Sequence, residues 1–293
     1  MRLTSRIHRV AVIGAGTMGH GIAQVAAMAG LSTRISDADA RALKVACDRI
    51  QANLAGAVSR GKLTEEAAGA AFSRIAAIPN VADAVHDQDL VIEAIVEDLQ
   101  AKRDLFSFLD EATAVETVLA TNTSSLSISQ IAAATRKPGR VLGMHFFNPV
   151  HIMRLVELVV HPATDQDVLA AARHVALEMG KQPIVVRDTP GFASSRLGLA
   201  LGLEAMRMLE SGVASAEDID TAMELGYGHP MGPLRVSDLV GLDVRLNIAE
   251  YLHRELKAPH FQPPEILRQK VRNGELGKKV GKGFYEWPKN QSS

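Results

Sequence analysis

The residues best suited to move a proton are a histidine and a carboxylate twelve positions later. His145 lies near the end of the apolar run Val141–Phe146, and Glu157 interrupts the apolar run Leu155–Val159. A carboxylate on a buried strand is costly unless it has a partner, and an imidazole is a natural one. The pair would orient the ring and favour its protonated form, which suits acid–base catalysis near neutral pH. A histidine with a purely structural hydrogen bond is the competing interpretation.

A glycine-rich turn with the spacing G-x-G-x-x-G is the candidate for binding a dinucleotide. It comprises Gly14, Gly16 and Gly19, and it directly follows the apolar run Arg9–Ile13. The first glycine allows a tight turn, the second lets a pyrophosphate approach the backbone, and the third lets helix and strand pack closely. The N-terminus of the following helix offers unpaired N–H groups to the phosphate charge. A glycine turn of structural use alone is the alternative.

An acid at the end of the next β-rich run bears on the choice of cofactor. Asp37 lies eighteen positions beyond Gly19, close to the separation expected for an acid that binds the adenosine ribose. Its carboxylate can accept hydrogen bonds from both ribose hydroxyls and would repel a 2′-phosphate. We therefore expect NAD rather than NADP as the cofactor, and we expect no metal.

Two further segments could contact a substrate. The cluster Thr121–Ser125 offers hydroxyls and an amide at the end of a predicted strand, where ligands of open α/β sheets bind. Capping of the next helix by Ser or Thr is the alternative there. The basic, glycine-rich segment Gly277–Tyr285 could reach phosphates, although a solvated terminal loop would have the same composition.

The elements that must position these residues alternate between strands and helices in the first part of the chain. The predicted strands are Arg9–Ile13, Thr33–Ser36, Leu90–Ala94, Val118–Thr121, Val141–Phe146, Leu155–Val159 and Ile184–Arg187. The helical periods between them include Gly19–Ala29, Ala38–Ser59 and Ala101–Ala112. This alternation implies crossover units and a parallel sheet covered on both faces, and therefore a doubly wound α/β fold of the Rossmann type.

The pattern changes near Asp188, beyond which no strand is expected. The helices predicted there are Ala193–Ser211, Ser215–Leu225, Val244–Leu256 and Pro264–Asn273. We therefore predict a dinucleotide-binding domain over residues 1–187 and an all-helical domain over residues 188–293.

Composition excludes several classes of protein. The chain has 293 residues, 47% of them apolar and 22% charged, as in ordinary globular proteins. A net charge of −1 argues against nonspecific binding of nucleic acid. The single cysteine, Cys47, forms no intrachain disulfide and is interpreted as a small buried side chain. No apolar run approaches the length of a membrane span, so a cytoplasmic protein is expected, with the matrix of an organelle as the alternative.

Six short motifs occur in the order found in one enzyme family, and together they extend from about Val10 to Trp287. They are Gly14–Gly19, Asn122–Ser125, His145–Pro149, Asp188–Phe192, Tyr227–Pro233 and Gly277–Tyr285. The chain thus resembles the 3-hydroxyacyl-CoA dehydrogenase family, which includes 3-hydroxybutyryl-CoA dehydrogenases. The resemblance implies NAD-dependent hydride transfer between an L-3-hydroxyacyl-CoA of short chain and the 3-ketoacyl-CoA, in β-oxidation or related acyl-CoA metabolism. It also implies a helical domain that binds substrate and forms a homodimer.

The resemblance assigns roles to individual residues. His145 matches the catalytic acid/base and Glu157 its orienting partner, while Ser124 matches the contact to the substrate's 3-oxygen and Asn148 lines the site. The positions that match cofactor contacts are Gly14, Gly16, Thr17, Met18, Gly19, Asp37, Glu97, Lys102, Ser124, Asn148 and Lys279. Ser195 is a departure, because family members often have asparagine there as a substrate contact. A serine can still donate a hydrogen bond, but it is shorter.

Three other functions fit the sequence less well. A β-hydroxyacid dehydrogenase acting on free acids shares the glycine-rich start but needs a catalytic lysine, and no lysine occurs between Arg187 and Arg235. A sugar-acid dehydrogenase of the lens-crystallin type fits the segment His145–Pro149 less well. The combination of Ser124, His145 and Glu157 argues against a noncatalytic NAD-binding protein.

Overall fold

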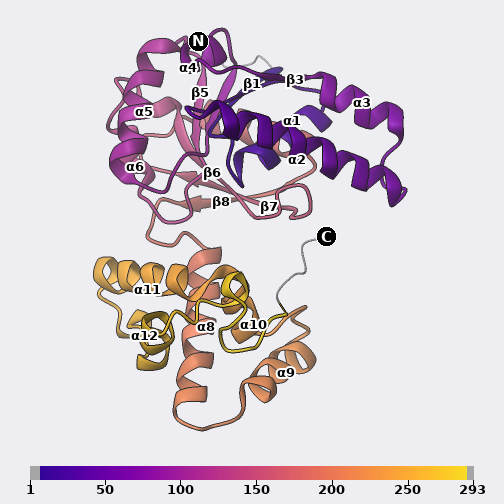
Figure 1. The fold of residues 1–293 in the computed structure, drawn as a ribbon. Helices are drawn as coiled ribbons and strands as arrows, with labels where there is room; N and C mark the ends of the chain where they lie inside the picture. Colours follow the sequence, from indigo (N-terminus) through magenta and orange to yellow (C-terminus); the bar gives the residue numbers. More distant parts are fainter. Residues whose placement is uncertain (1–6, 289–293) are drawn as a thin grey trace. The chain divides into compact units, whose positions relative to one another are not determined.

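The chain consists of two compact units, the first ending at Asp188 and the second beginning at Thr189 (Figure 1). The structure is a computed structural model, and it describes residues 7–288. The boundary between the units lies one residue beyond the position predicted from the sequence. We describe each unit by itself.

The first unit contains a single sheet with helices between its strands. Its strands are β1 (Arg9–Ile13), β2 (Ser32–Ser36), β3 (Ile75–Ala77), β4 (Leu90–Glu93), β5 (Val118–Thr121), β6 (Val141–Phe146), β7 (Leu155–Val160) and β8 (Gln182–Arg187). Its α-helices are α1 (Gly19–Met28), α2 (Ala40–Ser59), α3 (Glu65–Ser73), α4 (Val81–Val85), α5 (Leu99–Ala112), α6 (Ile128–Ala132) and α7 (Gln166–Glu178). The strands are ordered β3-β2-β1-β4-β5-β6-β7-β8. This is a Rossmann-type sheet, as predicted.

The strand order reverses direction between β1 and β4, where open α/β sheets bind their ligands. Ile13 at the end of β1 lies opposite Ser36 of β2 and Glu93 of β4, all in parallel pairing. The loops that follow these three strands therefore leave the sheet at the same edge. That edge receives the glycine-rich turn, Asp37 and the segment after Glu93.

Local sequence explains why the helices begin where they do. Five helices of the first unit start with a side chain that accepts a hydrogen bond from the first turn, which satisfies an otherwise unpaired N–H. These capping residues include Asp39 of α2, Thr64 of α3, Asp98 of α5 and Ser127 of α6. No side chain caps α1. The N-terminus of α1, which follows the glycine-rich turn, is therefore left to a ligand or solvent.

The expectation of a wholly parallel sheet was wrong at one pair of strands. β7 pairs antiparallel with β6, although β8 returns to parallel pairing with β7. Only residues 147–154 connect β6 to β7, and a parallel crossover needs a dozen residues or more. The sequence analysis also missed the three-residue strand β3, and the connecting helices α3, α4, α6 and α7 were not predicted.

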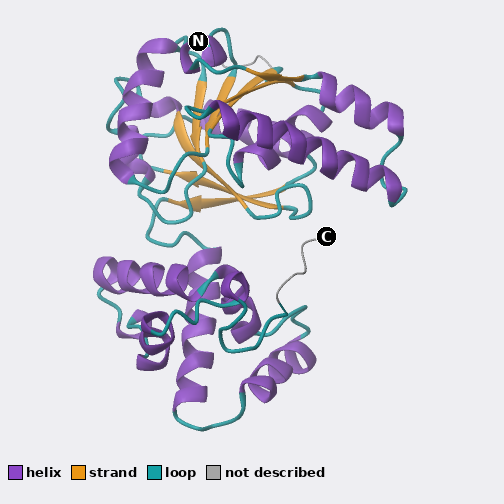
Figure 2. Ribbon diagram, viewed as in Figure 1, coloured by secondary structure: helices purple, strands orange, loops and turns teal. Residues whose placement is uncertain are grey.

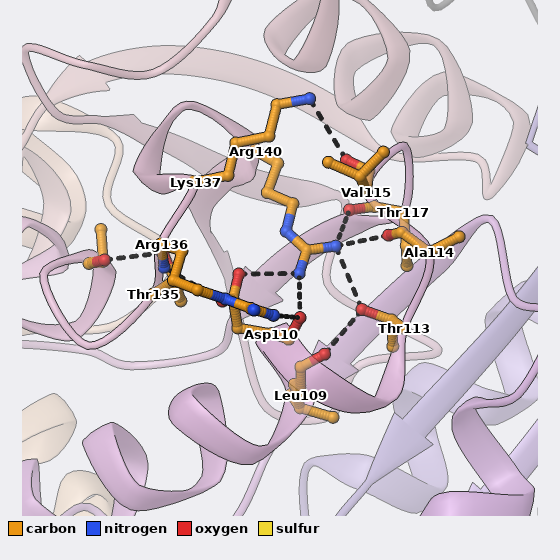
Figure 3. Close-up of polar contacts among 11 residues, drawn as sticks. Leu109, Asp110, Thr113, Ala114, Val115, Thr117, Thr135, Arg136, Lys137 and Arg140 are labelled. Atoms are coloured by element: carbon orange, nitrogen blue, oxygen red, sulfur yellow. Dashed lines mark hydrogen bonds and ion pairs between the residues drawn. The ribbon is translucent and has the colours of Figure 1, made fainter.

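A buried arginine joins α5, β5 and β6 at the far end of these strands from the glycine-rich turn (Figure 3). Arg140, which is 2% exposed, donates to the side chain and backbone oxygen of Asp110 and to the backbone oxygen of Ala114. Arg136 donates to the other oxygen of the Asp110 carboxylate at 2.7 Å. Burial by itself raises the pKa of Asp110, but the hydrogen bonds from both arginines outweigh it and lower the pKa to about 2.

The second unit is built from helices, and the strands drawn in Figure 2 all belong to the first unit. Its α-helices are α8 (Ser194–Glu210), α9 (Ala216–Tyr227), α10 (Pro233–Val240), α11 (Leu242–Leu256) and α12 (Glu265–Arg272). Its core is formed mainly by apolar side chains of these helices, including Leu203, Met206, Leu234 and Leu252. α10, which begins at Pro233, was not predicted. Among residues 7–288, no helix is both long and apolar enough to cross a bilayer.

Candidate active site

A cleft of about 900 Å³ lies at the edge of the sheet where the strand order reverses. Nine residues predicted for the site line it: Gly14, Gly16, Thr17, Met18, Asp37, Glu97, Ser124, His145 and Asn148. They come from the ends of β1, β2, β4, β5 and β6, or from the loops that follow these strands. The sheet therefore gathers at one site residues that are spread over more than a hundred positions of the sequence.

The glycine-rich turn has the shape that a pyrophosphate needs. Gly14 has a φ of +102°, and a Cβ there would collide with the backbone of Ala94. A Cβ on Gly19 would collide with the backbone of Gly14, so this glycine allows close packing of α1 on the turn. Beside Gly16, in contrast, no atom lies within 4 Å of the Cβ position. The open space at Gly16 and the uncapped start of α1 fit a bound phosphate group.

Asp37, the acid predicted to bind the adenosine ribose, lies in the cleft beside the glycine-rich turn. Its carboxylate accepts hydrogen bonds from the backbone N–H of Ala15 at 2.7 Å and from that of Asp39 at 2.9 Å. These bonds fix the carboxylate against the glycine-rich turn while the residue lines the cleft. A fixed negative charge at this point suits two ribose hydroxyls and disfavours a 2′-phosphate.

The predicted histidine–carboxylate pair is present. His145 and Glu157 are direct cross-strand neighbours on β6 and β7, and Nδ1 of the imidazole lies 2.7 Å from Oε2 of the carboxylate. Glu157 is fully buried, and the His145 ring also packs against Phe147, with 4.5 Å between ring centroids. The carboxylate thus lies behind the imidazole, which lines the cleft. The antiparallel pairing of β6 and β7, which was not predicted, places the two residues opposite each other.

Ser124 is held in the cleft by a carboxylate. Glu97 accepts hydrogen bonds from the backbone N–H of Ser124 at 2.9 Å, from its hydroxyl at 3.3 Å, and from the hydroxyl of Thr123 at 2.6 Å. Thr123 also accepts from the backbone N–H of Leu126 at 3.0 Å. Thr123 therefore organises the turn, and Ser124 lines the cleft, whereas the next helix, α6, is capped by Ser127, which lies outside the cluster Thr121–Ser125. The substrate contact expected of Ser124 stays a prediction.

A fully buried ion pair supports Glu97 from behind. Lys102 and Glu93 are both 0% exposed, and the ammonium lies 2.6 Å from one oxygen of Glu93 and 3.4 Å from Glu97. The same oxygen of Glu93 accepts from the N–H of Ile95, and the other accepts from the hydroxyl of Thr121 at 2.6 Å. Sequence reasoning missed Glu93. The sequence did contain a signal for it, because Glu93 ends an apolar strand and a lysine follows nine positions later.

Asparagine and lysine side chains fix the loop between β6 and β7. Asn122 accepts from the N–H of Phe146 at 2.9 Å, which ties the end of β5 to the end of β6. Lys181, nearly buried, donates to the backbone oxygens of Val150 and Met153, and burial lowers its pKa. The loop that carries Asn148 is therefore anchored at both ends.

The remaining predicted contacts lie outside this cleft. Glu157, Gly19 and Lys102 are buried and support it. Ser195, in the first turn of α8, and Lys279 belong to the second unit. Lys279 lies 2.6 Å from both carboxylate oxygens of Asp243. The roles predicted for Ser195 and Lys279 stay predictions.

Comparison with known proteins agrees with the geometry of the cleft. The family model described as "3-hydroxyacyl-CoA dehydrogenase, NAD binding domain" matches residues 9–189, and the model of the C-terminal domain of the same enzymes matches residues 191–287. The chain belongs to the 3-hydroxyacyl-CoA dehydrogenase family. Residues 9–189 thus form its NAD-binding domain, and the cleft with its open glycine-rich turn fits that cofactor.

Individual relatives are similar over almost their whole length. The chain is 43% identical to the probable 3-hydroxybutyryl-CoA dehydrogenase of Bacillus subtilis, covering 98% of this chain and 99% of the relative. It is also 43% identical to the mitochondrial hydroxyacyl-coenzyme A dehydrogenase of Homo sapiens, covering 96% and 91%. Among solved structures, FadB2 of M. tuberculosis superposes with a TM-score of 0.93 at 44% identity, covering 97% of this chain and 100% of FadB2. The (S)-3-hydroxybutyryl-CoA dehydrogenase PaaH1 of Ralstonia eutropha also gives 0.93, at 38% identity with the same coverage.

Proposed function

We propose that this chain is an NAD-dependent oxidoreductase that interconverts short-chain L-3-hydroxyacyl-CoA and 3-ketoacyl-CoA, with 3-hydroxybutyryl-CoA as a representative substrate. The observation that carries the proposal is the buried Glu157 carboxylate 2.7 Å from His145, in the cleft that contains the glycine-rich turn. A purely structural pair would not need its imidazole to line the cleft beside the glycine-rich turn, as that of His145 does. The reaction would serve fatty-acid or related acyl-CoA metabolism.

His145 would move the proton of the reaction. In the oxidative direction its imidazole accepts the proton of the 3-hydroxyl group, and in the reductive direction it returns a proton to the nascent alkoxide. Glu157 holds the ring by Nδ1 and stabilises the imidazolium that forms. Proton transfer by a positioned side chain typically contributes about 10²–10⁴-fold to the rate.

The other residues of the cleft would bind and orient the cofactor and the substrate. The open turn at Gly16 would receive the pyrophosphate, and Asp37 would receive the ribose of the adenosine. When bound there, NAD supplies the hydride acceptor, or NADH the donor, for C3 of the substrate. Ser124, fixed by Glu97, would hydrogen-bond the substrate's 3-oxygen, and Asn148 would line the same site. Positioning of the reacting carbons supplies much of the remaining acceleration. From the second unit, we propose Ser195 as a further substrate contact and Lys279 as a further cofactor contact.

An assay of NADH consumption tests the proposal. Purified protein should oxidise NADH when acetoacetyl-CoA is added, and should use NADPH far less well at the same concentration. Acetoacetate without CoA and a keto sugar acid serve as the matched negative substrates, because they represent the rival dehydrogenase classes. Turnover of either one in place of acetoacetyl-CoA would overturn the proposal.

We also propose that the chain is a cytoplasmic homodimer that pairs through the helical domain. Large apolar side chains are exposed on the second unit, including Leu197 at 71%, Leu225 at 83% and Tyr227 at 78%. Surfaces of this kind are commonly covered in closed two-fold dimers. Sedimentation equilibrium at micromolar concentration should give twice the mass of the chain, and a monomer would contradict the proposal.

A further inference from the structure

Asn122 is a residue of the cleft to which the proposed function gives no role. It directly follows β5 and lines the cleft together with Ser124 and His145. Its backbone N–H donates to the backbone oxygen of Glu93 at 2.7 Å, and its side-chain Oδ1 accepts from the N–H of Phe146 at 2.9 Å. The residue is therefore held by the end of β4 and by the end of β6 at the same time.

The bond to Phe146 fixes the direction in which the amide of Asn122 points. A backbone N–H is paired only by an acceptor, so the amide oxygen faces β6 and the amide nitrogen takes the other position. Nδ2 of Asn122 carries two N–H donors, and it donates to no oxygen atom of residues 7–288. A neutral donor of fixed orientation in the cleft is thus left to a ligand or to solvent.

The order of the strands indicates which part of a ligand would meet this donor. Across the sheet, the strands that end at the cleft are β2, β1, β4, β5 and β6. Asp37 after β2 suits the adenosine ribose, and the open turn after β1 suits the pyrophosphate. A dinucleotide binds across the point where the strand order reverses, which here lies between β1 and β4. Its nicotinamide half would therefore extend over the ends of β4 and β5, and the substrate is left to His145 on β6.

We propose that Nδ2 of Asn122 donates a hydrogen bond to the carboxamide oxygen of the nicotinamide and thereby orients the ring toward the substrate. The carboxamide is the one polar substituent of that ring, so a donor at the end of β5 has a single oxygen to bind there. Because the amide of Asn122 is neutral, it suits the oxidised and the reduced ring alike. The proposal rests on the position proposed for the cofactor in the cleft, and it does not depend on the identity of the substrate.

Binding of NADH and of ADP-ribose, which lacks the nicotinamide, tests the proposal without any substrate. Asn122→Asp keeps an oxygen for the N–H of Phe146 but replaces the donor by a second acceptor. It should raise the Kd of NADH about 5–100-fold, the range expected when an acceptor loses its donor, and leave the Kd of ADP-ribose nearly unchanged. Asn122→Ala also loses the bond to Phe146, so it should lower Tm more than Asn122→Asp does. The matched control is Asn53→Asp on α2, where Asn53 donates to Gln24 at 3.0 Å outside the cleft, and both Kd values should stay as in wild type.

Other results would overturn the inference in distinguishable ways. An equal rise in the Kd of NADH and of ADP-ribose for Asn122→Asp would show that the residue shapes the cleft and does not bind the nicotinamide. An unchanged Kd of NADH together with a raised KM for acetoacetyl-CoA would assign its donor to the substrate. An unchanged Kd of NADH together with a Tm as low as that of Asn122→Ala would leave it a structural role alone. Absence of turnover of acetoacetyl-CoA by wild type would instead refute the proposed function, since both Kd values are measured without substrate.

Discussion

Replacing Lys102 by methionine should destabilise the first unit by about 3–5 kcal/mol, the usual cost of breaking a buried ion pair from one side. Both Lys102 and Glu93 are 0% exposed and 2.6 Å apart. Methionine approximates the volume of the lysine stem, so the cavity left behind is small. What remains is a buried Glu93 carboxylate with two neutral donors, the N–H of Ile95 and the hydroxyl of Thr121.

A second substitution should reverse most of that loss. In Glu93→Gln/Lys102→Met no buried charge is left, and the amide can still accept from Ile95 while it donates to Thr121. We expect the double variant to lie within about 1 kcal/mol of wild type, because neutral replacements of a buried pair are often tolerated. Glu97→Gln is the matched control, since Glu97 is partly exposed and its loss should cost far less stability.

Urea unfolding measures these differences, provided that the two units are followed separately. Trp287 is the only tryptophan of the sequence and belongs to the second unit, so its fluorescence does not follow the first. Far-UV circular dichroism follows the helices of both units, and the transition that Trp287 fluorescence does not report is assigned to the first unit. Unchanged stability of Lys102→Met together with a large loss of NADH affinity would refute the reasoning. It would show instead that Lys102 acts directly on the cofactor.

Three more predictions concern the first unit. His145→Gln should lower kcat by about 10²–10⁴-fold with NADH binding nearly intact. Adding Glu157→Gln to this variant should lower kcat little further, because both substitutions impair the same proton transfer. Full additivity of the two effects in a double-mutant cycle on kcat/KM would contradict the pairing. Asp37→Ala should weaken NAD binding and narrow the preference over NADP, as measured by Kd values for NADH and NADPH; an unchanged ratio would contradict its role. The lowered pKa of Asp110 means that its ionised form stabilises the fold above pH 3.8, and that a contribution of about 2 kcal/mol is lost as the pH falls towards about 2. Asp110→Asn should therefore unfold more readily in urea at pH 7 and lose less stability on acidification, and an acid transition like that of wild type would contradict this account.

The sequence predicted the parts of the fold that have strong local signals. β1, β5 and β6 occur at the predicted residues, because each is an apolar run bounded by polar or glycine residues. β3 was missed because its three residues, of which two are alanine, bury little surface and have no period of their own. The direction of β7 follows from the short length of its connection to β6. The apolar pattern of each strand, taken by itself, carries no information about that direction.

Some residues of the candidate site could be predicted from the sequence itself, and others only from the family resemblance. His145 and Glu157 could be paired from the sequence because a lone carboxylate in an apolar strand demands a partner. Glu97 and Lys102 were assigned by resemblance alone, since their contacts to Ser124 and Glu93 depend on how α5 packs against β4 and β5.

Transfer of a deuterium label tests the central claim most directly. Protein is incubated with acetoacetyl-CoA and NADH that carries deuterium at the transferred position of C4, and the acyl product is examined by mass spectrometry and chiral analysis. The account predicts an L-3-hydroxybutyryl-CoA product with one deuterium on C3, formed by wild type and lost with His145→Gln. A product without deuterium, or equal product formation by His145→Gln, would contradict it.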